Sequence, residues 1–316
     1  MKTFLDDLKK ELKKRHFSKE DIEEILADHK EMIETAKNEG LSDDELASKF
    51  GDPAQLADDL LETKPLEVHK GGVQVEGYQL FQTFQVLDKA FNVAISLVSE
   101  DVKYLVHDKD QIEVHYKNIK DIEDYTVTFD GTEFVLRHEK SGVRCGHKES
   151  GKFVVKVPKD VQSNEFALQL VSGDAKVEGI QADQLKVNTT SGDVTVSNFT
   201  AKAAKFNTVS GDLTFHQGTL DELDISMVSG DCKLLNVAIS GNLGCNTVSG
   251  DLKVENSEAA DFVFKTVSGD CKGQEFYPKT VSFRSVSGDM KIKNSDNARE
   301  IKVVRSKALS GKVKIG

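Results

Sequence analysis

A tripeptide that recurs at a nearly constant interval constrains the fold of this 316-residue chain more than any other feature. Ser-Gly-Asp begins at Ser172, Ser191, Ser210, Ser229, Ser249, Ser268 and Ser287, so successive copies lie 19 residues apart, except for one interval of 20. A degenerate earlier copy reads Ser99-Glu100-Asp101, and a last one reads Ser310-Gly311-Lys312. Self-similarity at a fixed period of this length is typical of solenoids, in which each repeat stacks on its neighbours.

Apolar and polar residues alternate on both sides of each tripeptide. The position four residues before the serine holds Leu168, Val187, Phe206, Ile225, Cys245, Phe264 or Phe283. The position three residues after it holds Ala175, Val194, Leu213, Cys232, Leu252, Cys271 or Met290. This alternation predicts two strands per repeat, each with one face in the core. We expect equivalent strands to lie parallel and about 4.8 Å apart, which makes the fold mainly β, a β-helix-like solenoid with rungs of about 19 residues.

Each tripeptide supplies one glycine and one aspartate, which we interpret as structural residues of the turn. They are Gly173, Asp174, Gly192, Asp193, Gly211, Asp212, Gly230, Asp231, Gly250, Asp251, Gly269, Asp270, Gly288 and Asp289. Glycine admits the positive φ of a sharp turn, and aspartate can bond the turn backbone. Stacked carboxylates repel one another. A lysine two residues after the aspartate, as in Lys176, Lys233, Lys253, Lys272 and Lys291, predicts a compensating lattice of Asp–Lys pairs on the outside.

Calcium held by the aspartate column is an alternative that stays open, because calcium-binding β-rolls also stack Gly- and Asp-rich turns. Each turn here offers one aspartate and one serine, so we predict no metal and no cofactor. We also predict no catalytic residues. A polysaccharide-active enzyme on a β-helix needs a local cluster of carboxylates, arginine or lysine, whereas only His216 among the histidines lies inside the regular repeats.

The first 64 residues have helical periodicity. Leu5, Leu8 and Leu12 fall on one face of a first helix, and Ser18 with Asp21 resembles the capping box of a second. This segment carries 11 Lys and Arg against 18 Asp and Glu, so it would repel the phosphates of DNA. We predict an acidic helical domain over 1–64, a linker over 65–75 and a β-solenoid domain over 76–316, with regular repeats from about residue 166.

The charge and the ends of the chain bear on its location and partners. A net charge of −11 disfavours nucleic-acid binding. The first residues carry charges every few positions, as no signal peptide does, and no run of about 18 apolar residues could span a bilayer. The four cysteines form no C-x-x-C pair. We therefore predict a cytoplasmic protein without a transmembrane segment, with export to the cell surface by a non-classical route as the alternative.

The runs "TVSGDLTF", "MVSGDCKL", "TVSGDLKV" and "TVSGDCKG", with "FVVKVPKDV" upstream, resemble the bacterial putative-adhesin family, a β-strand repeat domain of unknown function. The resemblance covers roughly residues 90–316. The stretch "LASKFGDPAQLADDLL" resembles the small helical HAAS domain that often precedes such modules. The resemblance implies a β-helical fold without established catalytic residues, a setting in the cell envelope of Gram-positive bacteria and a link to envelope-stress responses.

Together these observations predict a non-enzymatic interaction or scaffold module that binds a protein or a component of the cell envelope. The leading alternative is a structural protein that assembles end to end, because open solenoid ends expose unpaired strand edges. A calcium-binding repeat and a polysaccharide-active enzyme are the remaining alternatives.

Overall fold

A computed structural model of the chain describes residues 2–14, 77–139, 150–296 and 299–316, together with positions 22, 25–27, 29–30, 33, 52–54 and 56. The chain divides into two compact units, Met1–Pro65 and Leu66–Gly316. In the first unit, Leu8 and Leu12 of helix α1 (Lys2–Lys14) are buried against Ile22 as predicted, whereas Leu5 is only half-buried. The predicted cap at Ser18 and Asp21 and the linker predicted over 65–75 lie outside the described residues.

The second unit is built almost entirely of strands. They are β1 (Gln79–Gln85), β2 (Asn92–Leu97), β3 (Asp101–His107), β4 (Gln111–Lys117), β5 (Tyr125–Phe129), β6 (Glu133–His138), β7 (Lys152–Pro158), β8 (Ser163–Leu170), β9 (Ala175–Glu178), β10 (Gln181–Ser191), β11 (Val194–Ser210), β12 (Leu213–Ser229), β13 (Cys232–Ser249), β14 (Leu252–Thr266), β15 (Cys271–Ser287), β16 (Met290–Lys293), β17 (Lys302–Ser310) and β18 (Val313–Ile315). A single 3₁₀ turn, η1 (Ile122–Asp124), precedes β5.

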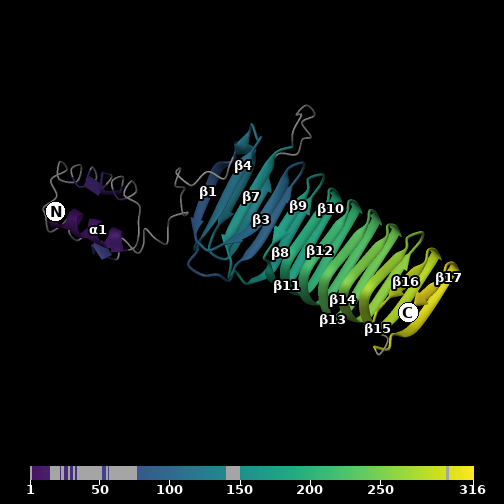
Figure 1. The fold of residues 1–316 in the computed structure, drawn as a ribbon. Helices are drawn as coiled ribbons and strands as arrows, with labels where there is room; N and C mark the ends of the chain where they lie inside the picture. The colour runs from purple at the N-terminus through teal and green to yellow at the C-terminus, as the bar shows by residue number, and fades with distance from the viewer. Residues whose placement is uncertain are drawn as a thin grey trace. The chain divides into compact units, whose positions relative to one another are not determined.

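Successive repeats stack as parallel strands, which confirms the predicted solenoid (Figure 1). The register follows the sequence period: Val194 lies opposite Leu213, which lies opposite Cys232 on the next rung. The apolar columns predicted from the alternation point inward, and the aromatic rings of Phe206 and Phe215 meet edge to face 4.6 Å apart in the core. Core packing and the parallel hydrogen-bond ladder therefore repeat together along the stack.

Each regular rung is one long strand with two bends, rather than the two separate strands predicted. In β12 the alternation of buried and outward residues slips at Gln217 and again at Asp221–Glu222. Gln217 has a φ of 55°, and Asn198, Asn236, Asn256 and Glu275 take the same left-handed conformation at the equivalent position, with φ between 49° and 56°. A single left-handed residue turns the strand sharply while its neighbours keep their bonds to the adjacent rungs. We call residues between the second bend and the tripeptide the long side of the rung.

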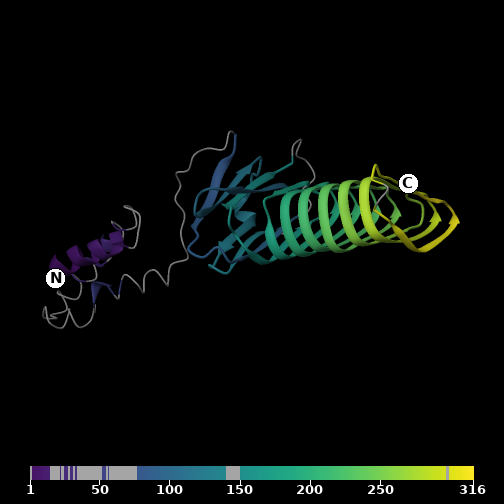
Figure 2. The same cartoon turned by 60° about the horizontal axis from the view of Figure 1, so that its bottom comes forward.

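The order of rungs along the stack differs from their order in the sequence. The rung formed by β2 and β3 lies between β6 with β7 on one side and β8 with β9 on the other. At this end, β4 runs antiparallel to β1 and β7, and β5 runs antiparallel to β6. Figure 2 shows the regular rungs, in green, stacked beside these blue strands. The antiparallel strands finish the N-terminal end of the solenoid, whereas the other end finishes on β17 and β18.

Candidate functional site

The turn glycines lie against one another along the stack. Gly230 has a φ of 107°, and a Cβ placed on it would lie 2.4 Å from the carbonyl oxygen of Gly211 on the preceding rung. A Cβ on Gly250 would lie 1.9 Å from the carbonyl oxygen of Gly230. Such distances are far below van der Waals contact, so the close approach of the rungs at this edge requires a residue without a side chain.

The aspartates form a hydrogen-bond ladder that runs along the stack. Oδ1 of Asp212 accepts the backbone N–H of Asp231 at 2.8 Å, and Oδ1 of Asp231 accepts that of Asp251 at 3.0 Å. The same bond joins every neighbouring pair from Asp101 to the last rung, at distances between 2.8 and 3.2 Å. Each carboxylate therefore satisfies the backbone of the following rung, and a bond to a charged acceptor is among the stronger ones.

The lattice of Asp–Lys pairs predicted on the outside is largely not formed. Among the described residues, Asp251 and Lys272 are the one predicted pair within ion-pair distance, at 3.5 Å. Lys253 pairs instead with Glu255, at 2.5 Å. The carboxylates point along the stack toward backbone amides, and the lysines two residues further on extend into solvent. Of the two predicted partners of the aspartates, backbone N–H groups are therefore the main one, although they belong to the next rung, and lysine contributes little.

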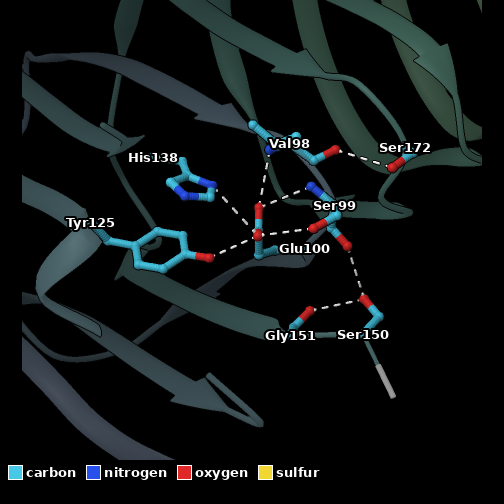
Figure 3. A network of polar contacts seen from close by, with 8 residues as sticks. All are labelled: Val98, Ser99, Glu100, Tyr125, His138, Ser150, Gly151 and Ser172. Atoms are coloured by element: carbon cyan, nitrogen blue, oxygen red, sulfur yellow. Dashed lines mark hydrogen bonds and ion pairs between the residues drawn. The ribbon is translucent and has the colours of Figure 1, made fainter. Parts of the chain in front are cut away.

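At the N-terminal end of this column, Glu100 occupies the position of the glycine (Figure 3). Its Oε2 accepts the N–H groups of Val98 and Ser99, both at 3.0 Å. Its Oε1 accepts the hydroxyl of Tyr125 at 2.7 Å and lies 3.6 Å from Nδ1 of His138. On the following rung the corresponding serine, Ser172, donates its N–H to the carbonyl of Val98. The buried carboxylate therefore accepts the N–H of Ser99, whereas Ser172 and Ser191 donate the equivalent N–H to a valine carbonyl of the neighbouring rung.

The charge of Glu100 is stabilised inside the protein. Burial alone would raise its pKa, but the hydrogen bonds from Tyr125, Val98 and Ser99 outweigh burial and hold the pKa below its usual value. Burial and the neighbouring Glu100 carboxylate raise the pKa of Tyr125, so the phenol stays protonated and donates. The ring of Tyr125 stacks on His138 with centroids 4.5 Å apart. This arrangement suits a fixed structural anion.

At the C-terminal end, Lys312 stands where the other rungs have aspartate. Its backbone N–H donates to Oδ1 of Asp289 at 2.8 Å, so it completes the last bond of the ladder. Lys312 therefore takes part in the ladder through its backbone N–H alone.

One apolar column faces outward along the same edge, directly before the serines. Its members, which we call the valine ridge, are Val171, Val209, Val228, Val248, Val267, Val286 and Leu309, with Thr190 at the equivalent position of one rung. The six valines are 46–49% exposed, and Leu309 is 86% exposed. The sequence analysis did not single out this column, although an apolar residue at an outward position of an alternating strand was readable from the repeat.

Groups suited to metal binding or catalysis do not gather elsewhere in the described part of the chain. No group of three or more His, Cys, Asp or Glu side chains is placed to hold a metal ion there. Cys232, Cys245 and Cys271 are buried free thiols, and burial raises the pKa of each. In the same residues, no helix is long and apolar enough to cross a membrane. The column of turns is thus the most regular arrangement of polar groups in the fold.

Family models match both parts of the chain. The family described as Toastrack DUF4097 matches residues 92–246 and 241–315, and the family described as HAAS matches residues 3–59. These matches confirm the resemblance inferred from the repeated motifs and from the helical segment. None of the curated proteins compared with the chain is similar to it.

Several solved structures are similar to the chain at low sequence identity. A protein from Parabacteroides distasonis, described as a putative lipid binding protein, is 14% identical with a TM-score of 0.51, over 77% of this chain and 98% of its own. A putative adhesin from Bacteroides fragilis is 15% identical with a TM-score of 0.40, over 78% and 100% of the two chains. Another from Parabacteroides merdae is 13% identical with a TM-score of 0.46, over 77% and 98%. At such identities the first likeness speaks for the fold alone.

Proposed function

The chain belongs to the Toastrack DUF4097 family, and from that premise we propose that it is a non-enzymatic interaction module, which presents the outer surface of its solenoid to a protein or to a component of the cell envelope. The exposed valine ridge carries this proposal. Six valines at equivalent positions are each about half exposed on an outer surface that is otherwise mostly polar. A repeated apolar column on the outside of a folded protein is typical of a binding surface.

Folding does not account for the ridge. Thr190 occupies the same position on β10, and the register of β10 with β11 is the same as elsewhere. A half-exposed valine also gains less from burial than one in the core. Binding is a better reason for the column, because an apolar ridge lowers its free energy when a partner covers it.

In this proposal the fourteen glycines and aspartates of the tripeptides are structural residues. They hold the rungs at a fixed spacing and so place the valines in a straight row. The close Gly–Gly contacts and the Asp–amide bonds support this role, since both act between rungs. Neither the Gly–Gly contacts nor the Asp–amide bonds require calcium.

A photo-activatable crosslinking residue placed at Val228 in the native host tests the proposal. We expect a crosslinked partner from this position. A matched residue at Lys202, which is exposed on a different side of the rung of β11, should give none or much less. If Val228 and the other ridge positions crosslink no more than Lys202, the interaction role is wrong.

End-to-end assembly is the second candidate, because β17 offers an edge with no further described strand beside it. Its residues between Lys302 and Lys307 include three cations, which discourage pairing of one edge with another. We therefore expect the sedimentation coefficient to stay constant as the protein concentration rises. Sedimentation that increases steadily with concentration would favour the scaffold instead.

The location of the protein separates cytoplasmic partners from envelope partners. We propose that the chain is cytoplasmic, and export to the cell surface by a non-classical route is the alternative. Protease added to intact cells should then leave it whole, while protease added to lysed cells should digest it. Digestion on intact cells would instead place it on the surface and favour a direct adhesive role.

A further inference from the structure

Positive charge collects at the C-terminal end of the solenoid. Residues 279–316 contain ten Lys and Arg against three Asp and Glu, a net charge of +7, in a chain whose total is −11. The charge is not spread evenly over the rungs. On the long sides of the last three rungs, Lys265, Arg284 and Lys307 stand at equivalent outward positions, where Asn188, Asn207 and Ser226 stand on three of the central rungs.

These cations lie beside the last three members of the valine ridge. Lys265, Arg284 and Lys307 each precede an exposed apolar residue by two positions, namely Val267, Val286 and Leu309. Side chains two apart on a strand point the same way and are about 7 Å apart. We call these six residues the basic apolar face. In this face a column of three cations runs beside a column of three exposed apolar side chains.

Two structural explanations do not account for this face. Cations on an edge strand prevent edge-to-edge pairing, which explains Lys307 on β17. Lys265 on β14 and Arg284 on β15 are different, because both strands are paired on both sides. Local charge pairing also fails as an explanation. Among the described residues, none of the three cations has a carboxylate within the 4.0 Å of an ion pair, although like charges directly opposite each other on neighbouring strands cost stability.

The surface across the turn carries further cations. A hollow of about 440 Å³ there is lined by six lysines, including Lys291, Lys312 and Lys314, and by the carboxylates of Glu255, Asp270 and Asp289. The last rungs therefore carry cations on both sides of an exposed apolar ridge. A soluble polyanion would use the cations but not the ridge. An anionic bilayer uses both, because its phosphates attract Lys and Arg while its interface accepts apolar side chains.

We propose that the basic apolar face docks the C-terminal end of the solenoid onto an anionic lipid bilayer. This inference rests on the proposed function, since it names a partner for one end of the valine ridge. Apolar residues Val267, Val286 and Leu309 enter the interface, and the neighbouring cations contact lipid phosphates. The face is small, so the attachment is weak and depends on salt.

Co-sedimentation of the full chain with vesicles tests this proposal. One set of vesicles contains phosphatidylglycerol and phosphatidylcholine, and the other contains phosphatidylcholine alone. We expect binding to the first set only, and release at about 1 M salt, where the Debye length is about 3 Å. The triple variant K265E, R284E, K307E should lower the partition coefficient by at least about tenfold. The control K103E, K176E, K205E makes the same change of charge on other rungs and should bind like the wild type.

A second pair of variants distinguishes a bilayer from a soluble polyanion. V267T, V286T, L309T removes apolar surface with a residue that the fold already accepts at Thr190, and it should weaken vesicle binding several-fold. L87T, which removes an exposed apolar side chain outside the valine ridge, is the control and should bind like the wild type. Circular dichroism confirms that each variant is folded. If V267T, V286T, L309T binds vesicles as well as the wild type does, the apolar residues do not enter the bilayer. Charge alone would then explain the binding, and the proposal would be wrong.

Two other outcomes would also overturn the proposal: no binding of the wild type to phosphatidylglycerol vesicles, or equal losses in both charge variants. Crosslinking from Val228 would still report on the proposed function in either case. Failure of the vesicle experiment with a successful crosslink would remove only the lipid partner. Failure of the crosslink would remove the interaction role itself.

Discussion

At the scale of single residues, the fold depends on a missing side chain and on a short carboxylate. The turn glycines allow successive backbones to approach more closely than any Cβ permits. The aspartates reach the amide of the next rung with one oxygen, a distance that the side chain of aspartate spans without strain. The repeated tripeptide is therefore explained by contacts between rungs rather than by the turn of a single rung.

Replacing Gly230 with alanine should lower the stability severely. The new Cβ would lie 2.4 Å from the Gly211 carbonyl oxygen, so we expect a loss of more than about 3 kcal/mol, measured as a lower urea midpoint. Gly131→Ala is the control, because Gly131 also has a positive φ, of 91°, but nothing lies within 4 Å of its new Cβ. That variant should lose only about 1–2 kcal/mol. Equal losses in the two variants would mean that φ alone, not the contact between rungs, requires glycine.

Replacing Asp231 tests the ladder itself. Asp231→Ala leaves the N–H of Asp251 without its acceptor, and we expect a loss of about 1 kcal/mol in urea unfolding. Asp231→Asn keeps an oxygen at the same place and should lose less. Lys312→Ala is the control at the end of the column and should change the stability by less than about 0.5 kcal/mol. A similar loss at Lys312 would contradict the role of the column in joining rungs.

At the scale of secondary-structure elements, the ends of the solenoid need solutions that the repeats do not. Inside the stack, every rung satisfies its backbone on two neighbours. At the N-terminal end, β4 and β5 run antiparallel beside the parallel strands, and the Glu100 carboxylate accepts the N–H groups of Val98 and Ser99. The antiparallel strands and the Glu100 carboxylate both accept bonds from backbone N–H groups. A buried N–H group without an acceptor costs about 1–3 kcal/mol of stability.

Glu100→Gln should destabilise the protein by about 1–3 kcal/mol at pH 7, because an amide offers one acceptor oxygen and no charge to four donors. The pKa of Glu100 is lowered by folding, so its contribution is present above its pKa in the unfolded chain, about 4.3. It is lost as the pH falls below that value toward the pKa in the folded protein.

The difference between wild type and Glu100→Gln in urea midpoint should therefore shrink between pH 7 and the onset of acid unfolding. Glu133→Gln, at an exposed carboxylate on β6, should show little difference at either pH. A gap between wild type and Glu100→Gln that widens as the pH falls would mean that the carboxylate is not held as an anion.

At the scale of the whole molecule, the column of aspartates does not require a metal. One oxygen of each carboxylate already accepts a backbone N–H along the entire stack. We expect the melting temperature to be the same in millimolar calcium and in excess chelator. A ligand at about 100 times its Kd stabilises by about 2.7 kcal/mol, which a melting curve detects easily. A clear rise in calcium would make the column a metal site.

The uneven charge is also a property of the whole chain. The N-terminal 64 residues carry a net charge of −7, while residues 279–316 carry +7. Charge of this kind steers partners of opposite sign to one end and does not specify a fold. The net charge of each segment can be counted from the sequence. Only the register of β14, β15 and β17 brings Lys265, Arg284 and Lys307 into one column beside the valine ridge.

The sequence by itself determined the repeating part of this protein. The 19-residue period predicted the parallel stack, the alternation predicted the core columns, and the spacing of Leu8 and Leu12 predicted the buried face of α1. These features are periodic and local, because each rung meets only its neighbours and the same contacts recur. The tertiary structure decided everything that breaks the period. It placed the Ser99 rung beside a segment 73 residues later, directed each aspartate to an amide of the next rung, and made Glu100 a buried acceptor of backbone N–H groups. Those outcomes depend on which donors each end of the stack leaves unpaired, and a count of residues along the chain carries no information about such distant partners.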